Sequence, residues 1–267
     1  MRKFIILSLC LSLFLSGFSL ALAKQDKTGN FAPDSAVATE SGTYDVQGHP
    51  ELKVKVIVHK AGAPSSPSVG ACGLADPDSS AVVPGTGWKL PPSWTYYLNS
   101  QSAPATVSRT SVSSIADNAF QAWLNQVGSK VVITKAGDTT IAKAARDGKN
   151  IIAWGRASGS ALGITYIWYN PTTHIVTDLD TILNLKFKWA WSDPTGWPKN
   201  TNTTCAFQGA YDAQDILTHE LGHWFGLDDV YTSDYTYNTM YGYGSTGQSN
   251  ADTLTSGDIA GVQAIYK

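Results

Sequence analysis

The sequence predicts an α+β fold, in which a twisted mixed sheet of about five strands carries two long helices and a further helix closes the chain. Three observations support this prediction. Short segments rich in β-branched and aromatic residues are bounded by Gly, Pro, Asn or Asp, as is typical of strands. One longer segment repeats its apolar residues at helical spacing, and two later segments begin at helix-capping residues. Hydrophobic residues make up 43% of the 267 residues, which is enough for a packed core.

The predicted strands follow one another through the middle of the chain. They span 94–98, 131–134, 151–154, 163–169 and 175–183. An earlier stretch, from Leu52 to His59, alternates in the same way and has the pattern of one more strand.

The predicted helices are placed by periodicity and by their ends. The first spans 108–127, where apolar residues share one face. The second runs from near Asp212, its expected N-cap, to Leu227. The third begins at Thr255, whose spacing to Asp258 fits a capping box.

Residues 1–23 have the features of a secretory signal peptide. A basic start precedes an apolar run over 4–22, and the small residues Ala21 and Ala23 mark a cleavage site after Ala23. The alternative is an uncleaved membrane anchor, because the run is just long enough to span a bilayer. Cleavage is the favoured interpretation, and it predicts a secreted protein that has no membrane attachment.

The remaining chain divides by composition. Residues 24–87 are rich in Ser, Pro, Gly and Ala and are interpreted as a pro-segment or N-terminal arm, whereas 88–267 is expected to form the main domain. Removal of the signal leaves Cys72 and Cys205, and a disulfide between them is the default expectation in an exported protein.

Charge excludes one class of function. The net charge is -2, only 15% of residues are charged, and no cluster of Lys or Arg follows the N-terminus. Nucleic-acid binding requires a basic surface, so nucleic acid is not an expected partner.

The most informative motif begins at His219. On a helix, His219 and His223 lie one turn apart on the same face, so both imidazoles can reach a single metal ion. Glu220 then lies beside the metal, where its carboxylate can accept a proton from bound water. The alternative is that the two histidines are ordinary core or surface residues. The whole chain has only five His, however, and two of them fall here at the spacing of metal ligands.

A third protein ligand is needed while one coordination position stays open for water or substrate. Gly226, three residues beyond His223, can take a positive φ and end the helix sharply. Asp229 then returns to the metal, although neighbouring Asp228 competes for this role. The predicted zinc ligands are therefore His219, His223 and Asp229.

This pattern, HExxHxxGxxD over 219–229, resembles the zinc signature of metzincin proteases, in the variant with a final Asp found in snapalysin-like enzymes. Metzincins also have a methionine turn beneath the metal, and Met240 fits that position. The C-terminal segment from Leu254 to Tyr266 is similar to the closing helix of matrixins. The resemblance implies a zincin or metzincin-like fold with an active-site cleft and a small C-terminal subdomain that holds the Met-turn and terminal helix.

The resemblance also implies a function. A secreted, monomeric zinc metalloendopeptidase is expected, in which Glu220 activates a zinc-bound water to hydrolyse protein or peptide substrates. The substrate is expected to lie extended along an edge strand around 161–166. The alternative from another class is a non-catalytic zinc-stabilised binding or adhesion module, which would need the ligands but not Glu220.

Several positions leave alternatives open. The surroundings of Cys72 faintly resemble the matrixin pro-segment, whose thiolate keeps the zymogen latent, but the Arg of that motif is absent and a disulfide with Cys205 is favoured. A structural Ca²⁺ is a further hypothesis, with acidic candidates Asp178, Asp180 and Asp193. A lone His in a turn such as 170–174 is more often exposed than a metal ligand, so His174 is a weak alternative. The tyrosine that metzincins have two residues after the methionine is absent, because that position is Gly242, and Tyr241 or Tyr243 is the alternative near the metal.

Overall fold

The computed structural model describes residues 40–62, 76–157, 159–192 and 209–267. The predicted signal peptide, Cys72, Cys205 and Asp193 lie outside these ranges, so the hypotheses about them stay predictions. Among the residues described, no helix combines the length and apolar character needed to cross a membrane.

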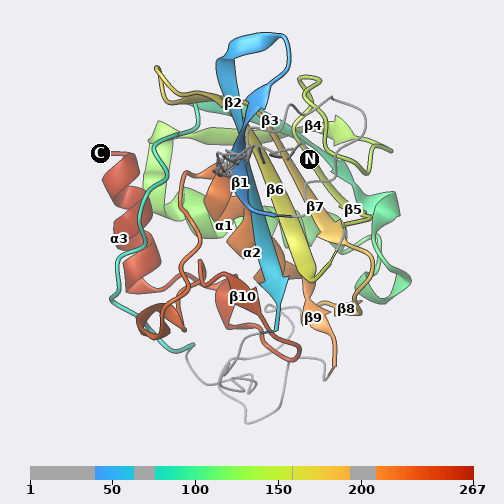
Figure 1. Cartoon of the computed structure of the whole chain (residues 1–267). Helices are drawn as coiled ribbons and strands as arrows, with labels where there is room; N and C mark the ends of the chain where they lie inside the picture. The colour runs from blue at the N-terminus through green and yellow to red at the C-terminus, as the bar shows by residue number, and fades with distance from the viewer. Residues whose placement is uncertain (1–39, 63–75, 158, 193–208) are drawn as a thin grey trace, which may run out of the picture.

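The main sheet has eight strands in the order β1-β2-β6-β7-β5-β3-β4, and short β10 pairs with the end of β2 (Figure 1). The strands are β1 Gly42–Val46, β2 His49–Ala61, β3 Ser93–Asn99, β4 Val132–Asp138, β5 Ile151–Gly155, β6 Ala161–Asn170, β7 Ile175–Asn184 and β10 Tyr243–Gly244. A separate pair joins β8 Trp189–Ala190 to β9 Tyr211–Asp212. The sheet is mixed, because β3, β4, β5 and β7 run parallel while β6 is antiparallel to β7.

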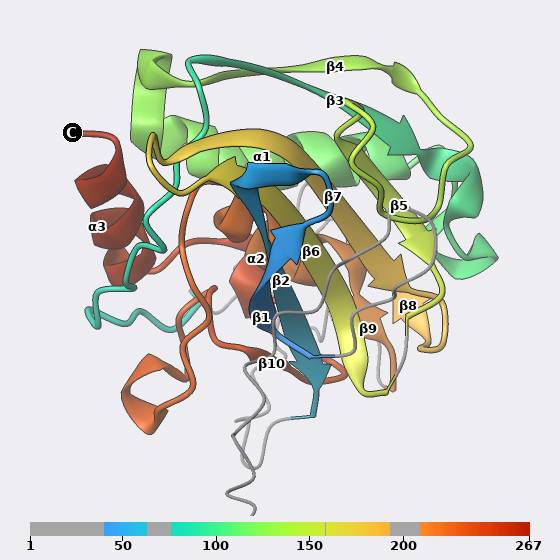
Figure 2. The same cartoon turned by 45° about the horizontal axis from the view of Figure 1, so that its top comes forward.

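Three helices accompany the sheet: α1 Val112–Val127, α2 Ala213–Trp224 and α3 Ser256–Ile265. Apolar residues of α1 and α2 share one core cluster with one face of the sheet, for example Trp123, Leu221 and Leu162. Figure 2 shows both helices on the same side of the strands. The α+β class is therefore confirmed, and β3 to β7 match the five predicted strands.

The second helix is unusual because all of its residues are buried. Asp212 caps its start as predicted, accepting hydrogen bonds from the backbone N–H groups of Gln214 at 2.9 Å and Asp215 at 3.1 Å. The helix ends at Trp224, and Gly226 follows with φ +95°. A Cβ at Gly226 would lie 2.4 Å from the carbonyl oxygen of Trp88, so only glycine allows this turn to pack against the segment that precedes β3.

The described part of the N-terminal arm contributes strands to the main sheet. The stretch from Leu52 to His59 does form a strand, but it lies within β2, which pairs antiparallel with β6 from Lys53 opposite Tyr169 to His59 opposite Gly163. The expectation that 161–166 is an edge strand is therefore wrong for this arrangement. The alternation in β2 predicted a strand there, whereas β1 and β10, which both pair with β2, were not predicted from the sequence.

Candidate metal centre

Helix α2 and the turn after it bring three predicted ligands together. The Nε2 atom of His219 lies 3.1 Å from Asp229 Oδ1, and the Nε2 atom of His223 lies 3.3 Å from the same oxygen. All three side chains are almost completely buried. Asp228 does not join them, because its Oδ1 accepts a hydrogen bond from the backbone N–H of Asp229 at 3.0 Å.

The hydrogen bonds of both imidazoles leave the same ring atom free. His219 Nδ1 lies 2.7 Å from the carbonyl oxygen of Thr239, and His223 Nδ1 lies 2.9 Å from that of Leu227. Since a carbonyl only accepts, each Nδ1 carries the proton and each Nε2 presents a lone pair. Within the described part of the chain, both Nε2 atoms and Asp229 Oδ1 are buried without a hydrogen-bond partner. Two imidazole nitrogens and a carboxylate oxygen without partners fit a zinc ion, which prefers these donors.

The electrostatics of this group favour bound positive charge. Burial alone would raise the pKa of Asp229, but the imidazoles of His219 and His223 beside it hold the pKa well below its ordinary value. Burial likewise lowers the pKa of His223, yet the nearby Asp229 carboxylate outweighs burial and raises the pKa to about 9, so a bound metal ion would take the place of a proton on Nε2. The carboxylate therefore stabilises a cation at the place where the three donor atoms meet.

Glu220 lies beside the donors and is held by a chain of hydrogen bonds. Its Oε2 accepts a hydrogen bond of 2.6 Å from the hydroxyl of Thr165, which lies 2.8 Å from the hydroxyl of Thr181. The indole N–H of Trp224 donates to Thr181 at 2.9 Å. Because Trp only donates and a carboxylate only accepts, every hydroxyl proton in the chain points toward Glu220. Gly163 leaves room for the carboxylate, since a Cβ there would lie 2.2 Å from Oε1.

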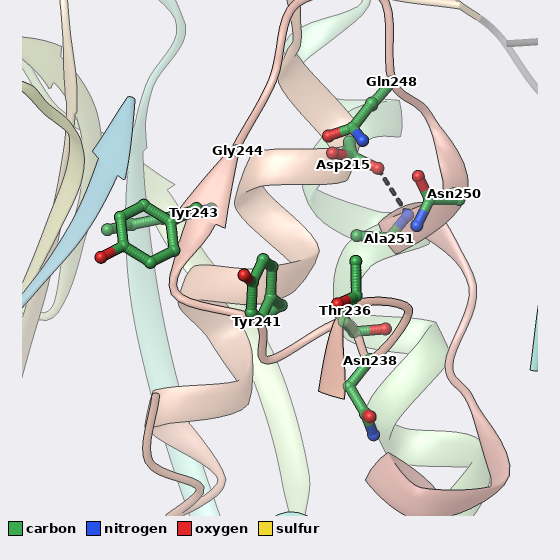
Figure 3. A pocket seen from close by; sticks show the side chains of 11 residues that line it. Asp215, Thr236, Asn238, Tyr241, Tyr243, Gly244, Gln248, Asn250 and Ala251 are labelled. Atoms are coloured by element: carbon green, nitrogen blue, oxygen red, sulfur yellow. Dashed lines mark hydrogen bonds between the residues drawn. The ribbon is translucent and has the colours of Figure 1, made fainter. Parts of the chain in front are cut away.

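Tyr231 is a site residue that the sequence analysis missed. Its hydroxyl donates to Asp229 Oδ2 at 2.7 Å, which leaves Oδ1 facing the imidazoles. Its spacing of two residues after Asp229 was the only signal, and such spacing is not specific. Tyr241 and Tyr243 line a polar pocket beside the Met-turn together with Asp215, Asn238 and Gly244 (Figure 3), and the ring of Tyr243 packs edge-on against that of Tyr231 at 5.4 Å between centroids.

Replacing Tyr231 by Phe is expected to weaken zinc binding by about 10-fold to 100-fold, as is typical when a partner of a metal ligand is lost. The carboxylate of Asp229 would lose the hydrogen bond that fixes its orientation. Competition with a chromophoric chelator measures the change. Tyr237→Phe is the matched control, because Tyr237 is similarly exposed. Equal zinc affinity in both variants would contradict the orienting role.

Met240 lies completely buried beneath the helix, as the Met-turn prediction requires. A Cβ at Gly222, between the two histidines, would lie 2.2 Å from Met240 Sδ, so glycine lets the thioether pack against the helix there. The turn is anchored by Asp258, whose carboxylate accepts from the backbone N–H groups of Thr239 at 2.9 Å and Met240 at 3.3 Å. The same carboxylate completes the predicted capping box with Thr255.

Asp258→Ala is therefore expected to lower the free energy of unfolding by about 3 kcal/mol, because several buried donors lose their acceptor at once. Chemical denaturation measures the effect. Asp78→Ala is the matched control, since Asp78 is exposed and accepts from the N–H and hydroxyl of Ser256 at the same helix end. If the two variants lost similar free energies of unfolding, the hydrogen bonds from Thr239 and Met240 to Asp258 would add no stability beyond that of helix capping.

The remaining candidates lie away from the centre. His174 is exposed in a turn, with φ 59°. Among the described residues, it does not belong to either group of side chains whose donor atoms lie close enough together to hold a metal ion. Asp178 and Asp180 use their oxygens to accept backbone N–H groups, from Gly148 and from Ala145 and Ile151. The calcium hypothesis therefore stays a prediction that gains no support from these two residues.

An α+β fold with a buried helix that presents two imidazoles and a carboxylate toward a second, nearby carboxylate is the arrangement expected of zinc-dependent hydrolases. The family model for matrixins matches residues 87–267, more than half of the chain. The chain belongs to the matrixin family, and it is thus a zinc metalloprotease that acts on protein or peptide substrates. This confirms the resemblance to matrixins found in the sequence, whereas the variant with Asp as the last ligand stays a prediction. A search of curated proteins found no match.

Proposed function

We propose that the chain is a secreted zinc metalloendopeptidase in which His219, His223 and Asp229 hold the ion and Glu220 is the general base. The observation that carries this proposal is the buried trio of donor atoms without partners, with a carboxylate one residue away along the helix. Secretion is supported by the N-terminal signal-like segment, and Met240 forms the floor of the site.

The chain's own residues supply the proton transfers. A bound zinc ion supplies Lewis acidity, which polarises the scissile carbonyl and makes water more acidic. Glu220 accepts the proton of the attacking water as the new C–O bond forms, and returns it to the nitrogen as the C–N bond breaks. The hydroxyl of Thr165 fixes Oε2, so Oε1 is the oxygen available for this transfer.

The rival function is a non-catalytic zinc-stabilised module. Such a module needs the three ligands but has no use for Glu220. Burying a carboxylate that has no function costs free energy, and Glu220 is completely buried. The hydrogen-bond chain from Trp224 also orients the Glu220 carboxylate toward the three donor atoms. The arrangement therefore favours the enzyme.

Removal of the metal tests the proposal. Chelation is expected to abolish cleavage of an unstructured protein such as casein, and stoichiometric zinc is expected to restore it. Metal analysis of the secreted protein should give one zinc per chain, and mass spectrometry of a peptide-library digest should show internal cleavage. Full activity in a protein that holds no zinc would overturn the proposal.

A further inference from the structure

Strand β2 lies beside the candidate metal centre although it precedes the part of the chain that matches the matrixin family, which begins at residue 87. It pairs antiparallel with β6 along eight residues, 53 to 60, and parallel with β10 at its C-terminal end. The N–H of Lys60 donates to Gly242 at 3.1 Å, and the N–H of Gly62 donates to Gly244 at 2.8 Å. The end of β2 is thus held between two backbone edges, as an extended peptide would be.

His59 occupies the point where this strand passes the site. Its imidazole is 2% exposed and stacks on His219, with ring centroids 3.7 Å apart. Its Nδ1 lies 3.6 Å from Glu220 Oε1, the carboxylate oxygen that is free of hydrogen bonds. Both nitrogens of His59 are buried, and neither has a hydrogen-bond partner among the residues that the structure describes. A buried polar ring without partners in this position indicates that it faces the reactive part of the site.

Side-chain contacts also hold β2 in this position. The Lys60 ammonium lies over the rings of Tyr231 and Tyr243, at 5.3 and 5.8 Å from their centroids. On the face of β2 opposite His59, Val54, Val56 and Val58 pack in an apolar cluster with side chains of β6. The strand is therefore held by backbone hydrogen bonds, a cation over aromatic rings and apolar burial.

We propose that the chain's own β2 occupies the channel between the backbone edges of β6 and β10, where an extended peptide substrate is expected to lie, and that His59 covers Glu220. The intact chain is then closed to substrate, and activity requires that β2 leave the channel. This inference rests on the proposed function. It differs from the cysteine hypothesis, because the occupant is a β-strand and the covering group is an imidazole.

The test uses the full secreted chain loaded with zinc, and intact mass confirms that each preparation is uncleaved. The variants are His59→Ala and, as the matched control on the same strand, His49→Ala, whose side chain is 41% exposed. A third variant, Ala61→Pro, removes the N–H that donates to Ser160 at 2.7 Å and weakens docking without changing His59. Thermal unfolding checks that all of them are folded.

The first readout is binding of a fluorescent extended peptide that ends in a hydroxamate, measured by anisotropy. His59→Ala and Ala61→Pro are expected to bind the probe roughly tenfold or more tightly than the unmodified chain, because apparent affinity scales with the fraction that is open. His49→Ala should match the unmodified chain. A synthetic peptide of residues 49–62 should displace the probe from His59→Ala.

The second readout is the initial rate of hydrolysis of a quenched peptide, which should rise in the same two variants. If the unmodified chain binds the probe as tightly as His59→Ala, or if His59→Ala loses activity while it keeps zinc, the inference is overturned and the proposed function stands. If no protein in the set holds zinc or cleaves the peptide, the proposed function fails, and this inference fails with it.

Discussion

Replacing Glu220 by Gln is expected to lower kcat for peptide hydrolysis by about 10²-fold to 10⁴-fold, the usual contribution of a positioned general base. The amide has nearly the same shape and can still accept the hydrogen bond from Thr165 through its oxygen. It cannot take a proton from water at neutral pH. Zinc content should not change, because Glu220 is not among the three donor atoms that converge on the ion.

The control for this variant is Glu51→Gln, which makes the same change at an exposed position on β2. Both proteins are assayed with a quenched peptide, and their zinc is measured by atomic emission. Equal rates for Glu220→Gln and the unmodified chain, at equal zinc content, would show that another group accepts the proton. Loss of zinc from Glu220→Gln would place this carboxylate among the ligands instead.

The central strands and the helices were predictable because their signals are local. The capping residues Asp212 and Thr255 satisfy backbone N–H groups within three residues of themselves, so their role is visible in the sequence. The positive φ of Gly226 follows the same logic, since a sharp turn after a helix needs glycine. Spacing along the helix likewise placed His219 and His223 on one face.

What the sequence did not predict depends on contacts between distant segments. The hydroxyl of Thr165 reaches Glu220 across 55 residues, and no pattern around Thr165 marks it. The strand from Leu52 to His59 was visible, but its partner was not, because alternation specifies a face of a strand and not its neighbour. β10 has only two residues and pairs only because β2 passes beside it.

Asp258 illustrates a middle case. Its place in a capping box is a local feature and was predicted. Its second role, holding the N–H groups of Thr239 and Met240, follows from how the Met-turn packs against α3. One carboxylate thus links the terminal helix to the floor of the metal centre, and the sequence shows only half of that function.

Asp229→Ala is expected to reduce zinc affinity by more than the roughly 10-fold to 100-fold that loss of an outer partner costs, since the proposed third ligand is removed. Two imidazoles alone leave too few protein donors for a stable zinc site. The negative charge of this carboxylate would also balance the positive charge of the buried ion, and without it the ion would be buried with less neutralising charge. Peptide hydrolysis should fall together with zinc content.

Asp228→Ala makes the same change one residue earlier and decides between the two carboxylates. Asp228 contributes a hydrogen bond to the backbone N–H of Asp229, whose loss costs about 1 kcal/mol of stability. Zinc affinity, measured by chelator competition, should therefore stay close to that of the unmodified chain. The reverse outcome, with zinc lost from Asp228→Ala and kept by Asp229→Ala, would assign the third ligand to Asp228. Retention of zinc in both single variants would mean that a donor outside this turn completes the site.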